Sequence, residues 1–468
     1  MSLLADARAT LMPGFVGTEL PDWMAALLAD GLVSCCLYGE NVVDPAQLRR
    51  LSDAVRAVRP DAIVALDEEG GDVTRVHYGA GSPFPGAAVL GRADDLDWTR
   101  SVAARVGEHV RAVGATMAFG PVADVNVDPD NPVIGVRSFG ADAQRTARHA
   151  AAWVEGVQGV GVAATAKHFP GHGDTAVDSH VGLPVVHADT ALLHARELAP
   201  FRAVIAAGAA AIMTSHIVVP AIDAVPATHS RAILTDLLRG ELGHQGVIVS
   251  DALDMAGASA EIGIPEAAVR ALAAGCDLLC LGTATGAEGI AAIERAVLAA
   301  VAEGRLDEER VRDAARRTRA MAAAGPQPLP LSALGEATAD DLARIRSTFA
   351  VGEDALRWIA QHERELAVGV VRLERAANIA AGAVPWDPFD GSTVVEPGAV
   401  PLLPAGPLIV LGKDLERGQE SAASITALRE RHDVLVIDAG WSAGRLADIA
   451  TFGASRACGL ALREMLGR

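Results

Sequence analysis

The chain has 468 residues, half of them apolar, and carries a formal net charge of −19 at pH 7. This length allows two or three domains with sizeable cores. The acidic balance argues against nucleic acid or an anionic membrane surface as a partner. No apolar run approaches the ~18 residues of a membrane-spanning helix, and the N-terminus lacks the basic and apolar regions of a signal peptide. We therefore expect a cytoplasmic protein.

Short apolar runs alternate with amphipathic helical patterns over the first two-thirds of the chain. Strands are expected at Gly31–Leu37, Ala62–Leu66, Ala115–Phe119, Gly161–Ala166, Ala209–Met213, Gly246–Val249 and Cys276–Leu281. Helices are expected at Pro45–Val58, Trp98–Val113, Ala143–Gln158, Ala191–Ala207, Arg231–Leu242 and Ile264–Ala274. Such alternation predicts an α/β fold with a parallel sheet. About seven or eight units fit a (β/α)8 TIM-type barrel, or a variant of it, better than an open sheet.

Polar and ionisable residues follow the predicted strands repeatedly. They are Asp67-Glu68-Glu69, Gly120–Asp124, the loop from Lys167, Thr214-Ser215-His216 and Ser250-Asp251. The carboxyl ends of barrel strands converge on one face, where active sites lie. Helix capping could explain one or two such cases, but it does not easily explain the whole set.

The pattern changes at the proline-rich segment Gly325–Pro330. We expect a catalytic barrel at 1–324, a linker at 325–335 and a small C-terminal α/β domain at 336–468. Residues 338–382 are predicted to be mostly helical. Later elements are expected as strands Pro407–Leu411 and Asp433–Ile437, a charged helix Asp414–His432 between them and a last helix Ser455–Leu466.

The five cysteines indicate a reducing compartment. They are Cys35, Cys36, Cys276, Cys280 and Cys458, and all but the last lie in apolar, strand-like runs. An odd number without metal-ligand spacing is typical of buried, reduced thiols in a cytoplasmic protein.

The segment Lys167–Asp174 (KHFPGHGD) concentrates a cation, histidines and a carboxylate directly after a predicted strand. Pro170 and Gly171 exclude a regular helix, so the segment must be an irregular loop. His168 and His172 have the spacing of two zinc ligands on one helix face. Because the intervening residues abolish that face, we expect neither a metal nor another cofactor.

A second pair of side chains follows in the same loop. Asp178 and His180 stand two residues apart, so an extended backbone points both side chains in the same direction. A carboxylate beside an imidazole fixes the tautomer of the ring and raises its basicity. Taken alone, this pair would more often be an ordinary capped loop with a surface histidine.

These motifs together resemble family 3 glycoside hydrolases, most closely their NagZ-like β-N-acetylglucosaminidase branch. The residues that carry the resemblance are Lys167–Gly173 with Asp178-Ser179-His180, Ser250–Met255 (SDALDM), Pro13–Phe15, Asp67–Gly71 with Arg75, and Ile134–Gly140. They lie in unbroken order between about residues 10 and 320. The C-terminal segment resembles, more weakly, a shortened form of the second α/β domain of the family.

The resemblance implies a role for individual residues. Asp251 would be the nucleophile that forms a covalent glycosyl-enzyme. His180, paired with Asp178, would be the acid/base group, donating a proton to the leaving oxygen and later accepting one from water. Asp67, Arg75, Arg137, Lys167 and His168 match the sugar-binding positions.

Several neighbouring residues keep more than one interpretation. His216 ends a strand on the catalytic face and could reach the sugar, while Asp254 is expected to cap the next helix. Glu68 and Glu69 are expected to point away from the pocket, because they adjoin a strand-end residue. His172 and Asp174 are interpreted as shaping their loop.

The sequence therefore predicts a metal-independent, retaining β-N-acetylglucosaminidase. Its partner would be a small carbohydrate with a terminal β-linked GlcNAc, such as a peptidoglycan turnover fragment. Aromatic residues make up only 4% of the chain, which favours a short-ligand pocket over a stacked polysaccharide groove. A phosphorylase is one alternative, because a histidine in place of an acid/base carboxylate would not repel phosphate. A β-glucosidase or β-xylosidase and a sugar-binding protein on a degenerate barrel are the others.

Overall fold

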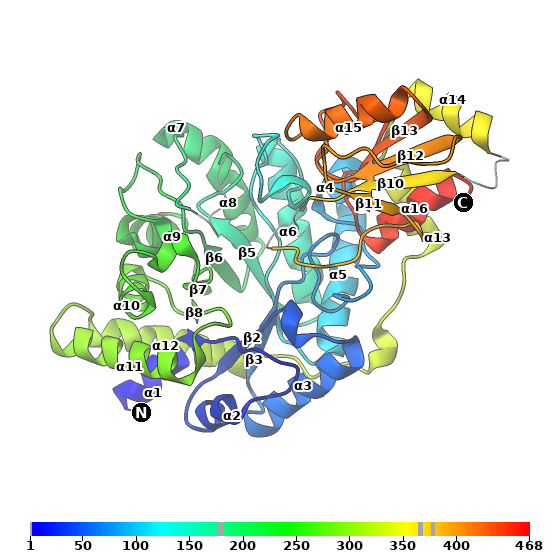
Figure 1. The fold of residues 1–468 in the computed structure, drawn as a ribbon. Helices are drawn as coiled ribbons and strands as arrows, with labels where there is room; N and C mark the ends of the chain where they lie inside the picture. Colours follow the sequence, from blue (N-terminus) through cyan, green and yellow to red (C-terminus); the bar gives the residue numbers. More distant parts are fainter. Residues whose placement is uncertain (1, 176–181, 364–367, 376–379) are drawn as a thin grey trace.

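The computed structural model describes residues 2–175, 182–363, 368–375 and 380–468. A barrel forms the larger part of the molecule, and a smaller domain packs against one side of it (Figure 1). Within these residues no helix has the length and apolar character needed to cross a membrane.

In the described part of the chain, eight short strands form the barrel. They are β1 (Leu11–Met12), β2 (Ser34–Leu37), β3 (Ile63–Leu66), β4 (Met117–Ala118), β5 (Ala163–Phe169), β6 (Ala211–Thr214), β7 (Val247–Val249) and β8 (Leu279–Cys280). Strands β2 to β7 pair in sequence order as one parallel sheet, and β1 pairs with β8. A parallel bridge from Val249 to Leu278 joins β7 to the start of β8, and Cys36 N donates to Pro13 O beyond β1. The ring is thereby closed, and the predicted TIM-type barrel is confirmed. β1 escapes prediction because two residues carry no periodicity.

Helices surround this ring, mostly between consecutive strands (Figure 1). They are α1 (Leu3–Ala9), α2 (Asp22–Ala29), α3 (Pro45–Val58), α4 (Ala87–Ala93), α5 (Leu96–Ala112), α6 (Ala143–Gly159), α7 (Thr190–Leu192), α8 (Leu198–Ala206), α9 (Ala256–Ser259), α10 (Ile264–Ala274), α11 (Gly286–Ala302) and α12 (Glu308–Ala323). Segments of 3-10 helix are η1 (Gly39–Asn41), η2 (Gly135–Arg137) and η4 (Ala227–His229), and segments of π-helix are η3 (Leu193–Glu197) and η5 (Ala232–Glu241). The predictions for α3 and α10 coincide with the observed bounds. Asp44 shows why α3 begins where it does, because its side chain accepts a hydrogen bond from Gln47 N ahead of Pro45.

The strands have two buried faces, as a barrel requires. In β2, Cys36 packs inside the barrel with Met12, Ala65 and Met213, whereas Cys35 packs outward against the helices. This alternation follows from the two-residue period of a strand. All five cysteines are buried and free, as predicted.

Within the described residues, the smaller domain contains a six-stranded sheet in the order β11-β10-β12-β13-β14-β9. Its elements are η6 (Leu331–Ala333), α13 (Ala339–Ser347), β9 (Ala350–Val351), α14 (Glu353–His362), β10 (Gly369–Leu373), β11 (Thr393–Val395), β12 (Pro407–Gly412), α15 (Glu420–Arg429), β13 (Asp433–Asp438), β14 (Ile449–Ala450) and α16 (Arg456–Met465). The prediction of mostly helix over 338–382 is wrong at β9 and β10. β10 pairs in parallel with both β11 and β12, and this long-range pairing outweighs local preference.

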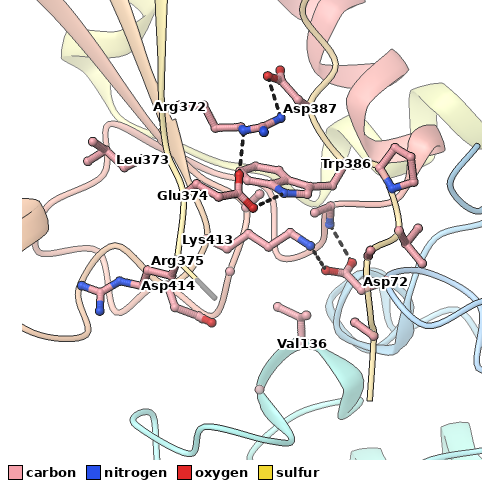
Figure 2. A pocket seen from close by; sticks show the side chains of 18 of the residues that line it. Asp72, Val136, Arg372, Leu373, Glu374, Arg375, Trp386, Asp387, Lys413 and Asp414 are labelled. Atoms are coloured by element: carbon pink, nitrogen blue, oxygen red, sulfur yellow. Dashed lines mark hydrogen bonds and ion pairs between the residues drawn. The ribbon is translucent and has the colours of Figure 1, made fainter. Parts of the chain in front are cut away.

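Polar contacts, most of them partly buried, join the two parts of the chain. Asp72, in the barrel, accepts hydrogen bonds from Lys413 Nζ at 3.0 Å and from Ala454 N at 2.8 Å (Figure 2). Asp341, in α13, accepts from Trp98 Nε1 at 3.0 Å and from both terminal nitrogens of Arg105 at 2.7 and 2.8 Å. The end of the barrel domain at 324 and the start of the second domain at 336 are predictions from the sequence.

Candidate active site

A cavity of about 480 Å³ lies at the carboxyl ends of the barrel strands. Its wall brings together six of the residues predicted for the site: Asp67, Arg75, Arg137, Lys167, His168 and Asp251. They come from the loop after β3, from η2, from the end of β5 and from the loop after β7, so the barrel closes residues far apart in sequence around one space. Asp178 and His180 lie outside the described residues.

A buried network of ions forms one side of this cavity. Lys167 is 2% exposed, and its Nζ lies 2.7 Å from Asp67 Oδ1 and 2.7 Å from Glu69 Oε1. Arg137 donates to the same Glu69 carboxylate from Nε at 2.9 Å and from Nη2 at 2.7 Å. Glu69 is absent from the lining of the cavity, as expected, but it pairs with two cations of the wall from behind. Its carboxylate supplies the counter-charge that these two largely buried cations need.

The network also fixes the protonation of its members. Burial raises the pKa of Asp67, but Lys167 and Arg75 outweigh burial and hold that pKa below its ordinary value. The pKa of Glu69 is lowered in the same way by Arg137 and Lys167 against the effect of burial. Burial alone would lower the pKa of Lys167. The carboxylates of Asp67 and Glu69 outweigh burial, so this pKa is raised above its ordinary value. Around pH 7 this wall therefore presents fixed, charged donors and acceptors.

Glu68 has a different role. It points away from the cavity, as expected, and accepts hydrogen bonds from Arg75 N at 2.8 Å and Val76 N at 2.9 Å. Burial raises the pKa of Glu68 to about 7. The hydrogen bonds to its carboxyl group thus fix the backbone of the loop that carries Arg75.

Asp124 is a site residue that the sequence prediction missed. This fully buried carboxylate lies 2.7 Å from His168 Nδ1 through Oδ2, and its Oδ1 accepts from His172 N at 2.7 Å. It holds the imidazole of His168 in one orientation at the cavity wall. The sequence did signal that Asp124 follows a strand. It gave no sign that Asp124 pairs with a residue 44 positions away.

The loop after β7 places the predicted nucleophile. Asp251 Oδ1 accepts a hydrogen bond from Ala252 N at 2.8 Å. His216 Nε2 lies 3.0 Å from Ala252 O, and its Nδ1 lies 2.9 Å from Thr228 Oγ1. His216 is absent from the lining of the cavity, so it supports the backbone beside Asp251 from behind.

Two residues left aside by the sequence prediction line the cavity as well. Asp254 was expected to cap a helix, but the residue that precedes α9 is Met255, and Asp254 lies in the cavity wall. His172 lines the cavity and also shapes its loop, since its Nδ1 lies 2.8 Å from Thr175 Oγ1. Burial lowers the pKa of His172 to about 4, so its ring is neutral at pH 7.

The wall as a whole suits a polyhydroxylated ligand. It combines charged donors and acceptors at fixed positions with the apolar surfaces of Phe119 and Met213. A carboxylate, Asp251, faces the same space and can act as a nucleophile. Among the described residues, His, Cys, Asp and Glu form no group of three or more that could hold a metal ion.

Comparisons with known proteins agree with this chemistry. The family model for the N-terminal domain of glycosyl hydrolase family 3 matches residues 14–321. A β-hexosaminidase of Pseudomonas aeruginosa is 39% identical over 272 residues, which are 55% of this chain and 78% of that protein. β-Hexosaminidase A of Pseudoalteromonas piscicida is 36% identical over 297 residues, 58% of this chain, and the match spans about half (48%) of that relative's length. A family 3 β-N-acetylglucosaminidase structure from Paenibacillus sp. str. FPU-7 has a TM-score of 0.83 and 30% identity, with 100% of this chain and 97% of that chain covered.

Proposed function

Because the chain belongs to glycosyl hydrolase family 3, we propose that it is a retaining β-N-acetylglucosaminidase. The prediction of a family 3 glycoside hydrolase is confirmed by the match over residues 14–321. The specificity for β-linked GlcNAc is supported by the relatives named β-hexosaminidase and by the β-N-acetylglucosaminidase structure. The observation that carries the proposal is one cavity whose wall holds Asp251 together with the charged residues Asp67, Arg137 and Lys167.

The ion network would bind the terminal sugar. Both oxygens of Asp67 are oriented by cations, Lys167 on one and Arg75 on the other, so the carboxylate presents its remaining lone pairs to adjacent hydroxyl groups. Arg137 and Lys167 offer donors from the same wall, and His168 offers its Nε2 atom. A sugar in the cavity should lie within hydrogen-bonding distance, ~3.2 Å, of this set.

Asp251 would perform the first chemical step. Its carboxylate oxygen attacks the anomeric carbon and the bond from that carbon to the glycosidic oxygen breaks, which leaves a glycosyl ester on Asp251. The departing oxygen needs a proton, and His180, assisted by Asp178, would donate it. In the second step the same imidazole accepts a proton from water, whose oxygen displaces Asp251 and restores the β configuration.

The natural substrate would be a small GlcNAc glycoside, of the kind released in peptidoglycan turnover. The cavity volume of about 480 Å³ lies at the lower end of the ~300–1,000 Å³ typical of small-ligand sites. The five buried, free thiols support a reducing, cytoplasmic location.

A product analysis tests the proposal. The protein is incubated with a GlcNAc disaccharide and with a chromogenic GlcNAc glycoside, with and without inorganic phosphate. We expect release of free GlcNAc with initial β configuration in both conditions. Accumulation of a sugar 1-phosphate would identify a phosphorylase instead, and release of glucose or xylose alone from matched aryl glycosides would identify the other family activities. Binding without turnover would indicate a sugar-binding protein.

A further inference from the structure

We infer that the second domain acts as a positioning element of the sugar site, because its backbone holds Arg75 in place. The inference rests on the proposed function, since it concerns how that site binds its sugar. The contact is made by residues 380–383, which follow β10 in the sequence and belong to the smaller domain.

Arg75 is tied to this segment by two hydrogen bonds. Its Nη2 donates to Ala380 O at 2.6 Å, and its Nη1 donates to Ala381 O at 3.2 Å. The same Nη2 lies 3.4 Å from Asp67 Oδ2. The side chain is only 6% exposed, so it has little freedom to find other partners. A guanidinium has five donors in a rigid plane, so the two carbonyls that bind Nη1 and Nη2 also fix how Nη2 faces the carboxylate of Asp67.

The segment also forms part of the cavity wall. Ala380 and Gly382 line the catalytic cavity together with Arg75 and Tyr78. Ala383 N donates to Tyr78 Oη at 3.1 Å. Gly382 has φ +70°, and a Cβ atom there would lie 2.9 Å from Tyr78 Oη. An added methyl group would therefore force either the Tyr78 hydroxyl or the segment itself to shift.

Contacts beyond the cavity hold the segment against the barrel. Gly382 lines both the catalytic cavity and a larger space of about 1050 Å³ between the domains. Figure 2 shows the wall of that larger space, where Lys413 bonds to Asp72 across the domain boundary and Trp386 lies beside Glu374. The carbonyls at 380 and 381 are therefore presented by a docked domain, which gives them a defined place relative to Arg75.

This arrangement separates binding from chemistry. Residues 380 and 381 bond to Arg75, the group that orients Asp67, whereas Asp251 is placed by the loop after β7, where Ala252 N donates to its carboxylate. Displacing the segment should weaken ground-state and transition-state binding equally, which raises KM and leaves kcat nearly unchanged.

Gly382→Ala tests the inference, with Gly444→Ala as the matched control. Gly444 has φ +75°, and no heavy atom lies within 4 Å of the position that a Cβ atom would take there, so it carries the same backbone cost without the collision. For hydrolysis of a chromogenic GlcNAc glycoside we expect Gly382→Ala to raise KM about tenfold with kcat within about twofold. Gly444→Ala should keep both parameters of the wild type.

A double-mutant cycle distinguishes positioning from general damage. In an Arg75→Ala background, Gly382→Ala should raise KM no further, because the group that it displaces is gone. Additive effects in the cycle would overturn the inference, and so would an unchanged KM in the single variant. If Gly382→Ala does not fold, Tyr78→Phe, which removes the acceptor of Ala383 N, takes its place with the same expectation. A wild-type protein without activity on GlcNAc glycosides would instead refute the proposed function.

Discussion

Glu69→Gln gives a direct measure of the ion network behind the cavity wall. The wild-type carboxylate accepts three short hydrogen bonds, two from Arg137 and one from Lys167, and its side chain is 6% exposed. Glutamine keeps the shape and one acceptor oxygen, but it sets an NH2 group against an N–H donor and leaves two buried cations with one counter-charge fewer. Breaking a buried pair costs about 3–5 kcal/mol, and we expect the lower end, about 3 kcal/mol, because one acceptor remains.

Urea unfolding at 25 °C measures this loss, with pH as a second variable. The depressed pKa of folded Glu69 stabilises the wild type fully above the unfolded pKa of about 4.3, and this contribution falls by about 1.4 kcal/mol per pH unit below it. The difference between wild type and variant should therefore be full at pH 7 and smaller at pH 3.5. Glu303→Gln, at an exposed pair with Arg305, is the control and should leave the free energy of unfolding unchanged. A loss under 1 kcal/mol at pH 7, or the same loss at both pH values, would refute this reasoning.

Three further outcomes follow from the site. Asp251→Asn should lower turnover by at least ~10³-fold in a folded protein, measured with a chromogenic GlcNAc glycoside; activity like the wild type would remove Asp251 from its role. His180→Ala should slow substrates with poor leaving groups far more than aryl glycosides, and Asp178→Ala should show the same trend more weakly; equal losses on both substrate types would exclude the acid/base assignment. Asp124→Asn should lower the free energy of unfolding by about 1.5–3 kcal/mol in urea titrations, since it weakens charge-assisted hydrogen bonds to His168 and the loop; no measurable change would contradict the pairing.

Most strands of the barrel could be predicted from local sequence patterns. Apolar runs followed by polar residues marked the strand ends, and Asp67, Lys167 and Asp251 do meet in one cavity. The reason is geometric: parallel strands in a barrel end on one face, so the position of a residue in its strand fixes its height in the molecule.

Side-chain pairs between distant parts of the sequence could not be predicted in the same way. Glu69 and Arg137 are 68 positions apart, and no local spacing signals that their charges meet. Glu69 was expected to point away from the pocket; it does not line the cavity, but its carboxylate pairs with Lys167 and Arg137, which do. β10 was predicted as helix because its place in the sheet depends on pairing with β11 and β12, which follow later in the chain.

The contacts of Asp341 determine which helices should unfold together. The carboxylate in α13 is held by Trp98 and Arg105 of α5, a barrel helix. Burial raises the pKa of this carboxyl, but Arg105 and Trp98, together with its other donors, outweigh burial and lower it. α13 should therefore exchange its amide hydrogens as slowly as α5, even when the sheet beyond it exchanges faster. The cooperative unit of the barrel would then extend past the proline-rich connector, and a truncation after residue 324 would remove part of that unit together with the second domain.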